Sequence, residues 1–104
     1  MMKFLYMIIL LVPTGTMADI HFTNNTGSYM DYKICDANGC KYSGCSASPG
    51  GGSNIPTSPG RYAVTGSTCK GWTSYNNYQP IGTFTVPENN YLMLYCNSPT
   101  SCSP

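Results

Sequence analysis

Six cysteines constrain the possible folds of this chain more than any other feature of its sequence. They are Cys35, Cys40, Cys45, Cys69, Cys96 and Cys102. An even number of cysteines in a short exported chain predicts a disulfide framework, although the sequence alone does not select the pairing. Zinc is the alternative, but zinc sites favour close cysteine pairs and histidines, and His21 is the only histidine. We therefore predict disulfides.

The N-terminal segment predicts that the chain is exported. Lys3 provides a short positive region, and Phe4 to Val12 is an unbroken apolar run. Thr16-Met17-Ala18 then places small residues ahead of a cleavage site. The apolar run is too short for a membrane-spanning helix, which needs roughly 20 residues. We predict a signal peptide over residues 1–18, cleavage before Asp19, and no membrane span in the exported protein.

The exported part, residues 19–104, is electrically balanced. Once Lys3 has left with the signal peptide, the remaining Lys and Arg residues equal the Asp and Glu residues in number. Binding to nucleic acid or to an anionic membrane requires clustered positive charge, so we expect neither partner. A chain this short forms a single domain with a thin core, and disulfides commonly compensate for that deficit.

Alternation of apolar and polar residues predicts strands along most of the exported part. The clearest example is residues 29–35, where Met30, Tyr32 and Ile34 would share the buried face. Further strands are predicted at 20–23, 40–43, 61–66, 69–72, 81–86 and 91–96. About five to seven short strands with frequent turns predict an all-β fold, a small disulfide-stapled antiparallel β-sandwich or open barrel.

Two connections are predicted to be hairpins. Asp36-Ala37-Asn38-Gly39 is a strong turn signal, because Asn-Gly readily adopts positive φ. The second hairpin would join 81–86 to 91–96 through residues 87–90. Its buried face would carry Phe84, Val86, Leu92 and Leu94.

Two segments are predicted to lack regular structure. Residues 46–60 are rich in Pro, Gly and Ser. Glycines raise the entropic cost of order and prolines remove hydrogen-bond donors, so we predict a long flexible loop within the domain. The tail, residues 97–104, is expected to be loose apart from a tether at Cys102.

The composition argues against enzymatic chemistry. Catalysis needs titratable or nucleophilic side chains within mutual reach. Besides His21, the exported part has only four carboxylates, none in a catalytic motif: Asp19, Asp31, Asp36 and Glu88. We therefore expect no enzymatic activity and no cofactor.

Aromatic residues in or beside predicted loops are the main candidates for binding. They are Tyr42, Trp72, Tyr75 and Tyr78, and the last three share the segment 70–80 with amide side chains. Aromatic rings with polar edges supply contact area at low entropic cost and mark recognition surfaces. The alternative is that individual tyrosines form cross-strand pairs that support a small core. As a group, the four aromatic residues predict a surface for a protein or carbohydrate ligand outside the cytoplasm.

The predicted cleavage site creates one candidate metal site. A terminus Asp19-Ile20-His21 offers its α-amine, two backbone amides and an imidazole as four nitrogens in a plane, the geometry that Cu(II) and Ni(II) prefer. The alternative is that His21 is a polar-face residue of the first strand, whose amides are then hydrogen-bonded and unavailable.

The sequence also contains an N-glycosylation sequon, Asn24-Asn25-Thr26, which matters only in a glycosylating export pathway. Taken together, these features predict a secreted or periplasmic, non-enzymatic interaction module. It would present aromatic-rich loops on a disulfide-stabilised β scaffold, chiefly residues 70–80 and also 46–60. The alternative is a small secreted toxin, inhibitor or antimicrobial effector, for which a stapled β fold is equally suited.

Overall fold

The computed structural model describes residues 18–104, so the predicted signal peptide lies outside it except for Ala18. Within this range the chain is all-β, as predicted, and no helix capable of crossing a membrane occurs there. The strands are β1 (Ala18–Asn24), β2 (Tyr29–Asp36), β3 (Gly39–Tyr42), β4 (Gly52–Thr57), β5 (Gly60–Lys70), β6 (Thr73–Ser74), β7 (Gln79–Val86), β8 (Tyr91–Ser98) and β9 (Ser101–Ser103).

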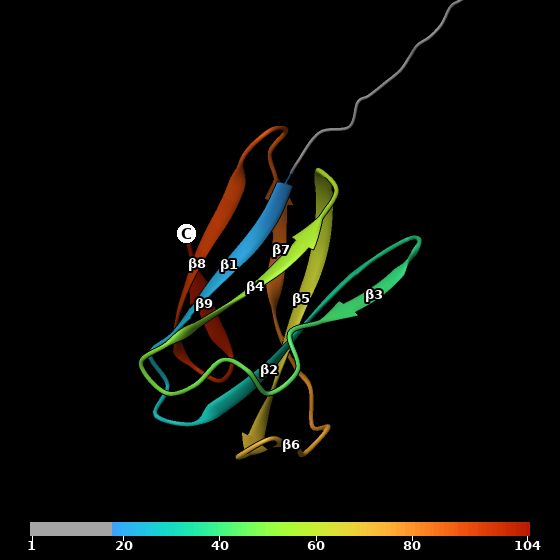
Figure 1. The fold of residues 1–104 in the computed structure, drawn as a ribbon. Coiled ribbons are helices and arrows are strands. Elements are labelled where there is room, and N and C mark those ends of the chain that lie inside the picture. The colour runs from blue at the N-terminus through green and yellow to red at the C-terminus, as the bar shows by residue number, and fades with distance from the viewer. Residues whose placement is uncertain (1–17) are drawn as a thin grey trace, which may run out of the picture.

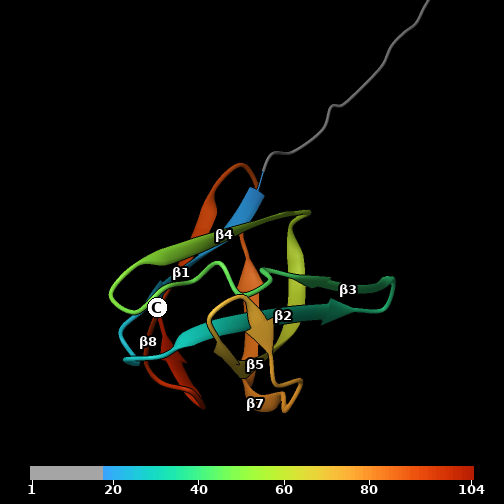
Figure 2. The same ribbon diagram turned by 60° about the horizontal axis from the view of Figure 1, so that its bottom comes forward.

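The strands form two sheets that pack against each other (Figures 1 and 2). Sheet A has the order β4-β1-β8-β9. Sheet B has the order β3-β2-β5, and both β6 and β7 pair with the far edge of β5. The pair β1–β8 is parallel, and the other paired strands are antiparallel. In both views the β2–β3 hairpin projects from the body of the molecule.

The core lies between the two sheets, because strand geometry turns every second side chain inward. The predicted inward residues of β2, Met30, Tyr32 and Ile34, are each at most 1% exposed. Phe22 of β1 stacks on Tyr32 across the sheets, with ring centroids 4.2 Å apart. The core comprises Ile20, Phe22, Met30, Tyr32, Ile34, Ala47, Ile55, Tyr62, Val64, Val86, Leu94 and Cys96.

The hairpin predicted between β7 and β8 is wrong as a pairing, although both segments are strands. β7 pairs with β5 in sheet B and β8 pairs with β1 in sheet A, so residues 87–90 cross between the sheets. The predicted burial is correct, since Val86 and Leu94 are buried and Phe84 and Leu92 pack against the core. Alternation indicates which face of a strand is apolar, but it does not indicate which strand lies beside it.

The prediction that residues 46–60 form a loop is wrong for the second half of the segment. There β4 pairs with β1, and Ile55 enters the core with 3% exposure. A Cβ added at Gly52 would lie 2.7 Å from the carbonyl oxygen of Phe22, so the close approach of the strands requires glycine there. Pro56 is tolerated because β4 is an edge strand, where a missing donor need not break a ladder.

Two smaller predictions also need correction. The predicted strand 69–72 is the end of the long strand β5 followed by a turn at Gly71 and Trp72. The tail, residues 97–104, is not loose, because β8 continues to Ser98 and β9 pairs back onto it.

All six cysteines form disulfides, as predicted. The pairs are Cys35–Cys40, Cys45–Cys69 and Cys96–Cys102. The first and third close the β2–β3 and β8–β9 hairpins, and the second ties the loop after β3 to the end of β5. Three disulfides indicate an extracellular or otherwise oxidising compartment.

Candidate functional site

The four predicted binding residues all belong to sheet B or to the segment 71–78 that follows β5. We call Tyr42, Trp72, Tyr75 and Tyr78 the sheet B surface. Trp72 is 82% exposed, Tyr75 58% and Tyr42 56%, whereas Tyr78 is half-buried. Three of the four predicted residues are therefore open to solvent.

Hydrogen bonds fasten the segment 71–78 onto sheet B. The Ser67 hydroxyl on β5 donates to Oδ1 of Asn77 at 2.8 Å and accepts the Asn77 backbone N–H at 3.1 Å. The Tyr75 N–H donates to the carbonyl oxygen of Thr68 at 3.0 Å. These bonds satisfy backbone groups that would otherwise face water in an open loop. They fix the part of the chain that carries Trp72 and Tyr75.

Tyr78 anchors this segment to β2. Its hydroxyl donates to Oδ2 of Asp31, a residue that is only 4% exposed. The Lys33 ammonium lies 4.5 Å from the centroid of the Tyr78 ring, a cation–π arrangement, and the Tyr42 ring meets it edge-on at 6.0 Å. Burial, followed by the hydrogen bond to Asp31, raises the pKa of the Tyr78 hydroxyl. Tyr78 thus contacts both β2 and β3 and fastens the segment 71–78 to them.

Sequence reasoning missed two residues of this region, Tyr29 and Lys33. Tyr29 lies beside Trp72, with ring centroids 6.4 Å apart. The alternation of β2 predicts the orientation of both residues, because it places them with Asp31 on the face opposite Met30. That alternation was the available signal, but it did not show that the segment 71–78 lies on this face.

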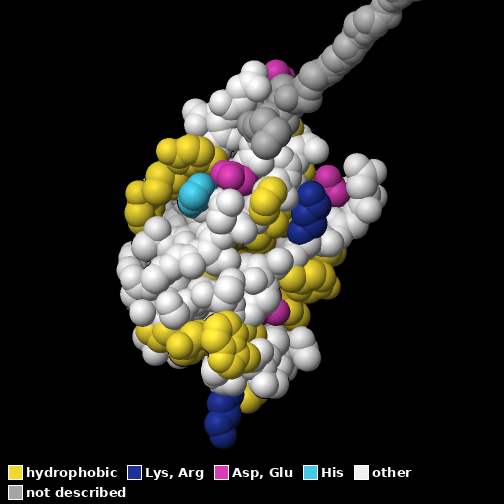
Figure 3. Space-filling model, in the orientation of Figure 1, with side chains coloured by type: hydrophobic (Ala, Val, Ile, Leu, Met, Phe, Trp, Pro, Cys, Tyr) yellow, Lys and Arg dark blue, Asp and Glu magenta, His cyan; other side chains and the backbone are white. Residues whose placement is uncertain are grey.

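A second group of exposed side chains lies along β8 in sheet A. Tyr91, Met93 and Tyr95 are 52%, 39% and 42% exposed. The ring of His21, on the neighbouring strand β1, lies 4.8 Å from that of Tyr91. We call His21, Tyr91, Met93 and Tyr95 the sheet A surface. Figure 3 shows the histidine beside an acidic side chain and next to hydrophobic side chains on the side where β8 runs.

A shallow hollow of about 470 Å³ adjoins the sheet A surface. Met93 and His21 line one part of it, and Ser46, Ser53 and Asn54 supply hydroxyl and amide groups. None of its lining residues is Lys, Arg, Asp or Glu. The hollow therefore combines an apolar patch with uncharged hydrogen-bonding groups.

The predicted copper or nickel site is not compatible with the folded sheet. Asp19 and His21 do lie together, with Oδ1 and Nε2 3.5 Å apart. However, β1 is paired with β4 on one edge and with β8 on the other over residues 19–23. The amides of Ile20 and His21 therefore lie within sheet ladders and cannot bind a metal while β1 keeps these pairs. Nor does any group of three or more His, Cys, Asp or Glu side chains in residues 18–104 lie close enough to hold a metal ion.

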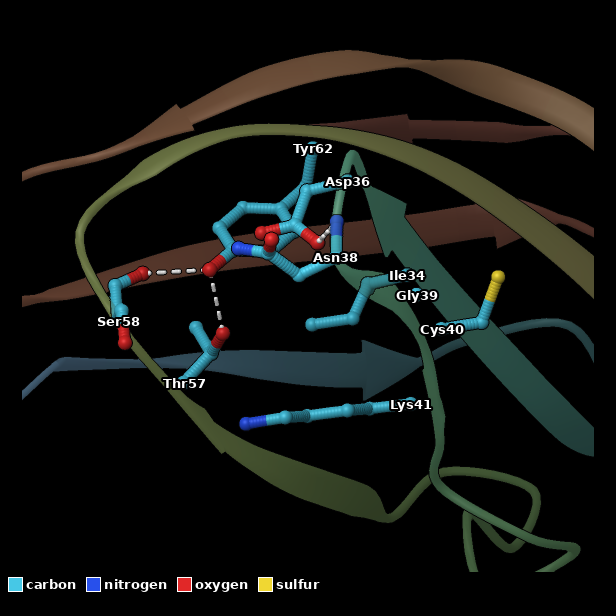
Figure 4. Close-up of a pocket in the computed structure, with 9 residues that line it drawn as sticks. All are labelled: Ile34, Asp36, Asn38, Gly39, Cys40, Lys41, Thr57, Ser58 and Tyr62. Atoms are coloured by element: carbon cyan, nitrogen blue, oxygen red, sulfur yellow. Dashed lines mark hydrogen bonds between the residues drawn. The ribbon is translucent and has the colours of Figure 1, made fainter.

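A separate polar pocket of about 210 Å³ lies between the β2–β3 hairpin and the β4–β5 turn (Figure 4). The Tyr62 hydroxyl accepts a hydrogen bond from Oγ1 of Thr57 at 2.7 Å and donates one to the carbonyl oxygen of Ser58 at 2.8 Å. Asp36 accepts the N–H of Asn38 at 2.9 Å, an interaction that stabilises the hairpin turn. The hydroxyl of Tyr62 and a carboxylate oxygen of Asp36 thus already have partners within the fold. None of the predicted binding residues lines this pocket.

Comparison of the chain with protein-family models, with curated proteins and with solved structures finds no match. A functional proposal therefore rests on the geometry and chemistry of these surfaces.

Proposed function

We propose that this protein is an exported, non-enzymatic binding module whose sheet B surface recognises a neutral polysaccharide. The observation that carries the proposal is Trp72, whose indole ring is 82% exposed on a segment held in place by hydrogen bonds. Burial of large aromatic rings normally stabilises a small fold, and exposed aromatic groups mark binding surfaces.

The fixed conformation of the segment 71–78 supports this proposal. A flexible loop loses conformational entropy when it binds, and this loss weakens the affinity. Here the bonds from Ser67 to Asn77 and from Tyr78 to Asp31 already hold the chain in place. Trp72 and Tyr75 would therefore meet a ligand with little further ordering of the backbone.

The polar groups around the aromatic rings favour an uncharged ligand. Asn76, Asn77 and Gln79 are exposed amides next to the rings. Of the nearby charges, Asp31 is buried beneath Tyr78, Lys33 lies against the Tyr78 ring, and Lys70 is a single exposed charge at the end of β5. A sugar ring presents C–H groups that stack on aromatic faces and hydroxyls that hydrogen-bond to amides. An anionic ligand would find no cluster of positive charge here.

The carboxylates also support a role without catalysis. Asp31 is buried under Tyr78, and Asp36 accepts the N–H of Asn38 in the hairpin turn. Asp19 contacts His21 on the other sheet. These groups have structural partners in three separate places, whereas acid–base catalysis would need them to converge on one substrate.

A pull-down with insoluble polysaccharides tests the proposal. The exported protein, with its disulfides intact, is incubated with cellulose, chitin, β-glucan and mannan particles, and the bound fraction is measured over a range of protein concentrations. We expect binding to at least one neutral polymer, with little dependence on salt because few charges take part. Trp72→Ala should weaken it by about tenfold or more. Thr85→Ala, an exposed change on β7 outside the sheet B surface, is the matched control.

Two results would contradict the proposal. One is undiminished binding by a correctly folded Trp72→Ala protein. The other is binding to none of the neutral polymers, and inhibition of a protease or of microbial growth would then favour the inhibitor or toxin class.

A further inference from the structure

The most exposed large hydrophobic side chains in residues 18–104 fall into two sets of three. One set, Tyr42, Trp72 and Tyr75, belongs to sheet B and the segment 71–78. The other set, Tyr91, Met93 and Tyr95, follows a single strand of sheet A. The second set faces away from sheet B, because the alternate residue Leu94 of the same strand is 0% exposed in the core between the sheets. The molecule therefore exposes two separate groups of large apolar side chains.

A comparison of β7 with β8 shows that outward positions of a strand in this fold can be occupied by smaller polar residues. Both strands turn alternate residues outward, and β7 exposes Thr83 and Thr85 at such positions. Threonine and tyrosine are both favoured in strands, so threonine at positions 91 and 95 would serve the sheet equally well. Tyr91 and Tyr95 thus leave about half of each side chain in water, although the Tyr91 ring also contacts that of His21.

From these observations we propose that the sheet A surface is a second binding face for a neutral polysaccharide. One protein molecule would then hold two polysaccharide chains, or two segments of one polysaccharide chain, at once. This inference deepens the proposed function and rests on it.

The chemistry of the sheet A surface fits the same class of ligand. The hollow beside Met93 has no Lys, Arg, Asp or Glu among its lining residues, so it favours a neutral polymer over a strongly ionic one. Asn54 supplies an amide group for sugar hydroxyls, next to the apolar side chain of Met93. The Ser46 and Ser53 hydroxyls hydrogen-bond to each other at 2.9 Å, so they keep only acceptor positions for a ligand. His21 is held between Asp19 and the Tyr91 ring.

The shape of the sheet A surface favours an extended polymer over a compact ligand. Alternate residues of a strand lie about 7 Å apart, so Tyr91, Met93 and Tyr95 form a row about 14 Å long. The hollow opens beside the middle of this row, at Met93. Successive sugar rings could then stack along the row while their hydroxyls reach the hollow.

Two binding faces on one rigid domain have a measurable consequence. A molecule bound through one face can attach to a second strand through the other, which raises the apparent affinity for a polymer surface and links separate particles. A molecule with one face would coat particles without joining them. Particle agglutination therefore distinguishes two faces from one.

The test compares three forms of the protein on particles of the neutral polysaccharide that wild type binds. The sheet A variant is Tyr91→Thr/Tyr95→Thr, which keeps strand-forming residues in β8, and the sheet B variant is Trp72→Ala/Tyr75→Ala. Thr85→Ala is the control. We expect wild type and the control to agglutinate the particles. Each double variant should still bind them, with apparent affinity lower by on the order of tenfold to a hundredfold, but should not agglutinate them. Circular dichroism and urea unfolding verify the fold of each variant.

Several outcomes separate this inference from the proposed function. If the sheet A variant agglutinates particles as wild type does, the inference is overturned and the proposed function stands. If the sheet A variant loses all binding while the sheet B variant loses none, the sheet B assignment and the two-face inference both fail. If light scattering shows that wild type is a dimer and the sheet A variant is a monomer, the sheet A surface joins two copies of the chain, and the inference is again overturned.

Discussion

The hydroxyl of Tyr32 allows a direct test of the energetics of the core. Tyr32 is 0% exposed, its ring stacks on Phe22, and its hydroxyl finds no hydrogen-bond partner within residues 18–104. Burial of a hydroxyl without a partner costs about 1–3 kcal/mol. Tyr32→Phe removes only this oxygen atom and keeps the stacked ring. We expect the substitution to raise the free energy of unfolding by about 1–2 kcal/mol.

Tyr62 provides a matched control for Tyr32. It is also buried, at 5% exposure, but its hydroxyl accepts a hydrogen bond from Thr57 and donates one to Ser58. Tyr62→Phe removes the same atom and leaves those groups without their partner. We expect it to lower the free energy of unfolding by about 1–2 kcal/mol. The same chemical change should therefore shift stability in opposite directions at the two positions.

The pH dependence of stability gives a second measure of the same group. Burial raises the pKa of Tyr32 from 10.0 to about 12. The folded protein thus keeps this phenol protonated at a pH where the unfolded chain loses the proton. Below pH 10.0 the phenol is protonated in both the folded and the unfolded protein, so its titration does not lower the free energy of unfolding. As the pH rises from 10.0 to about 12, the unfolded chain ionises first, and the free energy of unfolding falls. The loss amounts to about 3 kcal/mol, and Tyr32→Phe should remove it.

Urea unfolding of wild type and both variants measures these effects, with disulfides intact and circular dichroism as the signal. The series runs at neutral pH and at several values above pH 10.0. Equal m-values would show that the substitutions change stability and not the surface exposed on unfolding. If Tyr32→Phe destabilises the protein as much as Tyr62→Phe does, the Tyr32 hydroxyl has a partner in the native state and the reasoning is refuted.

Three further predictions concern other parts of the fold. Asn24→Ala should lower the free energy of unfolding by about 2–4 kcal/mol in urea, because it leaves one buried and two partly buried backbone groups without their partner. Replacement of both Cys45 and Cys69 by Ser should lower it by about 3 kcal/mol, since this bridge closes the longest disulfide loop, with a sequence separation of 24. Tyr78→Phe removes the hydrogen bond to Asp31 and should speed amide hydrogen exchange in the segment 71–78, as measured by mass spectrometry.

Local alternation correctly predicted which side chains enter the core, but it did not predict the partners of the strands. Met30, Tyr32 and Ile34 alternate with polar residues, and that period alone places them inward. The parallel pair β1–β8 joins segments far apart in the chain, such as Ile20 and Leu92. No turn connects these strands, so no local signal specifies their pairing. In contrast, the turn residues 87–90 favour a hairpin between β7 and β8, but they connect strands of different sheets.

Tertiary contacts also explain why the strand β4 was missed. Its prolines and glycines are unfavourable for a strand, but pairing with β1 and burial of Ile55 stabilise it in the folded protein. For the candidate site, loop position correctly identified exposed residues such as Trp72 and Tyr75. The alternation that predicts Leu92 and Leu94 on the buried face also implies that Tyr91 and Tyr95 point away from the core. It did not reveal that His21 lies beside them, because that contact depends on the β1–β8 pair.

The sequon at Asn24 shows how the fold decides what a motif can do. Asn24 is 0% exposed, and its Nδ2 atom donates to the carbonyl oxygens of Ser28 at 2.7 Å and Ala47 at 2.8 Å. Its Oδ1 atom accepts from the N–H and the hydroxyl of Thr26. Glycosylation would replace one Nδ2 hydrogen with a bulky sugar, for which the buried site has neither space nor a spare bond. A chain glycosylated at Asn24 before folding therefore cannot adopt this structure. The threonine that completes the sequon acts here as a hydrogen-bond partner of the asparagine, so the folded protein explains both residues without a glycan.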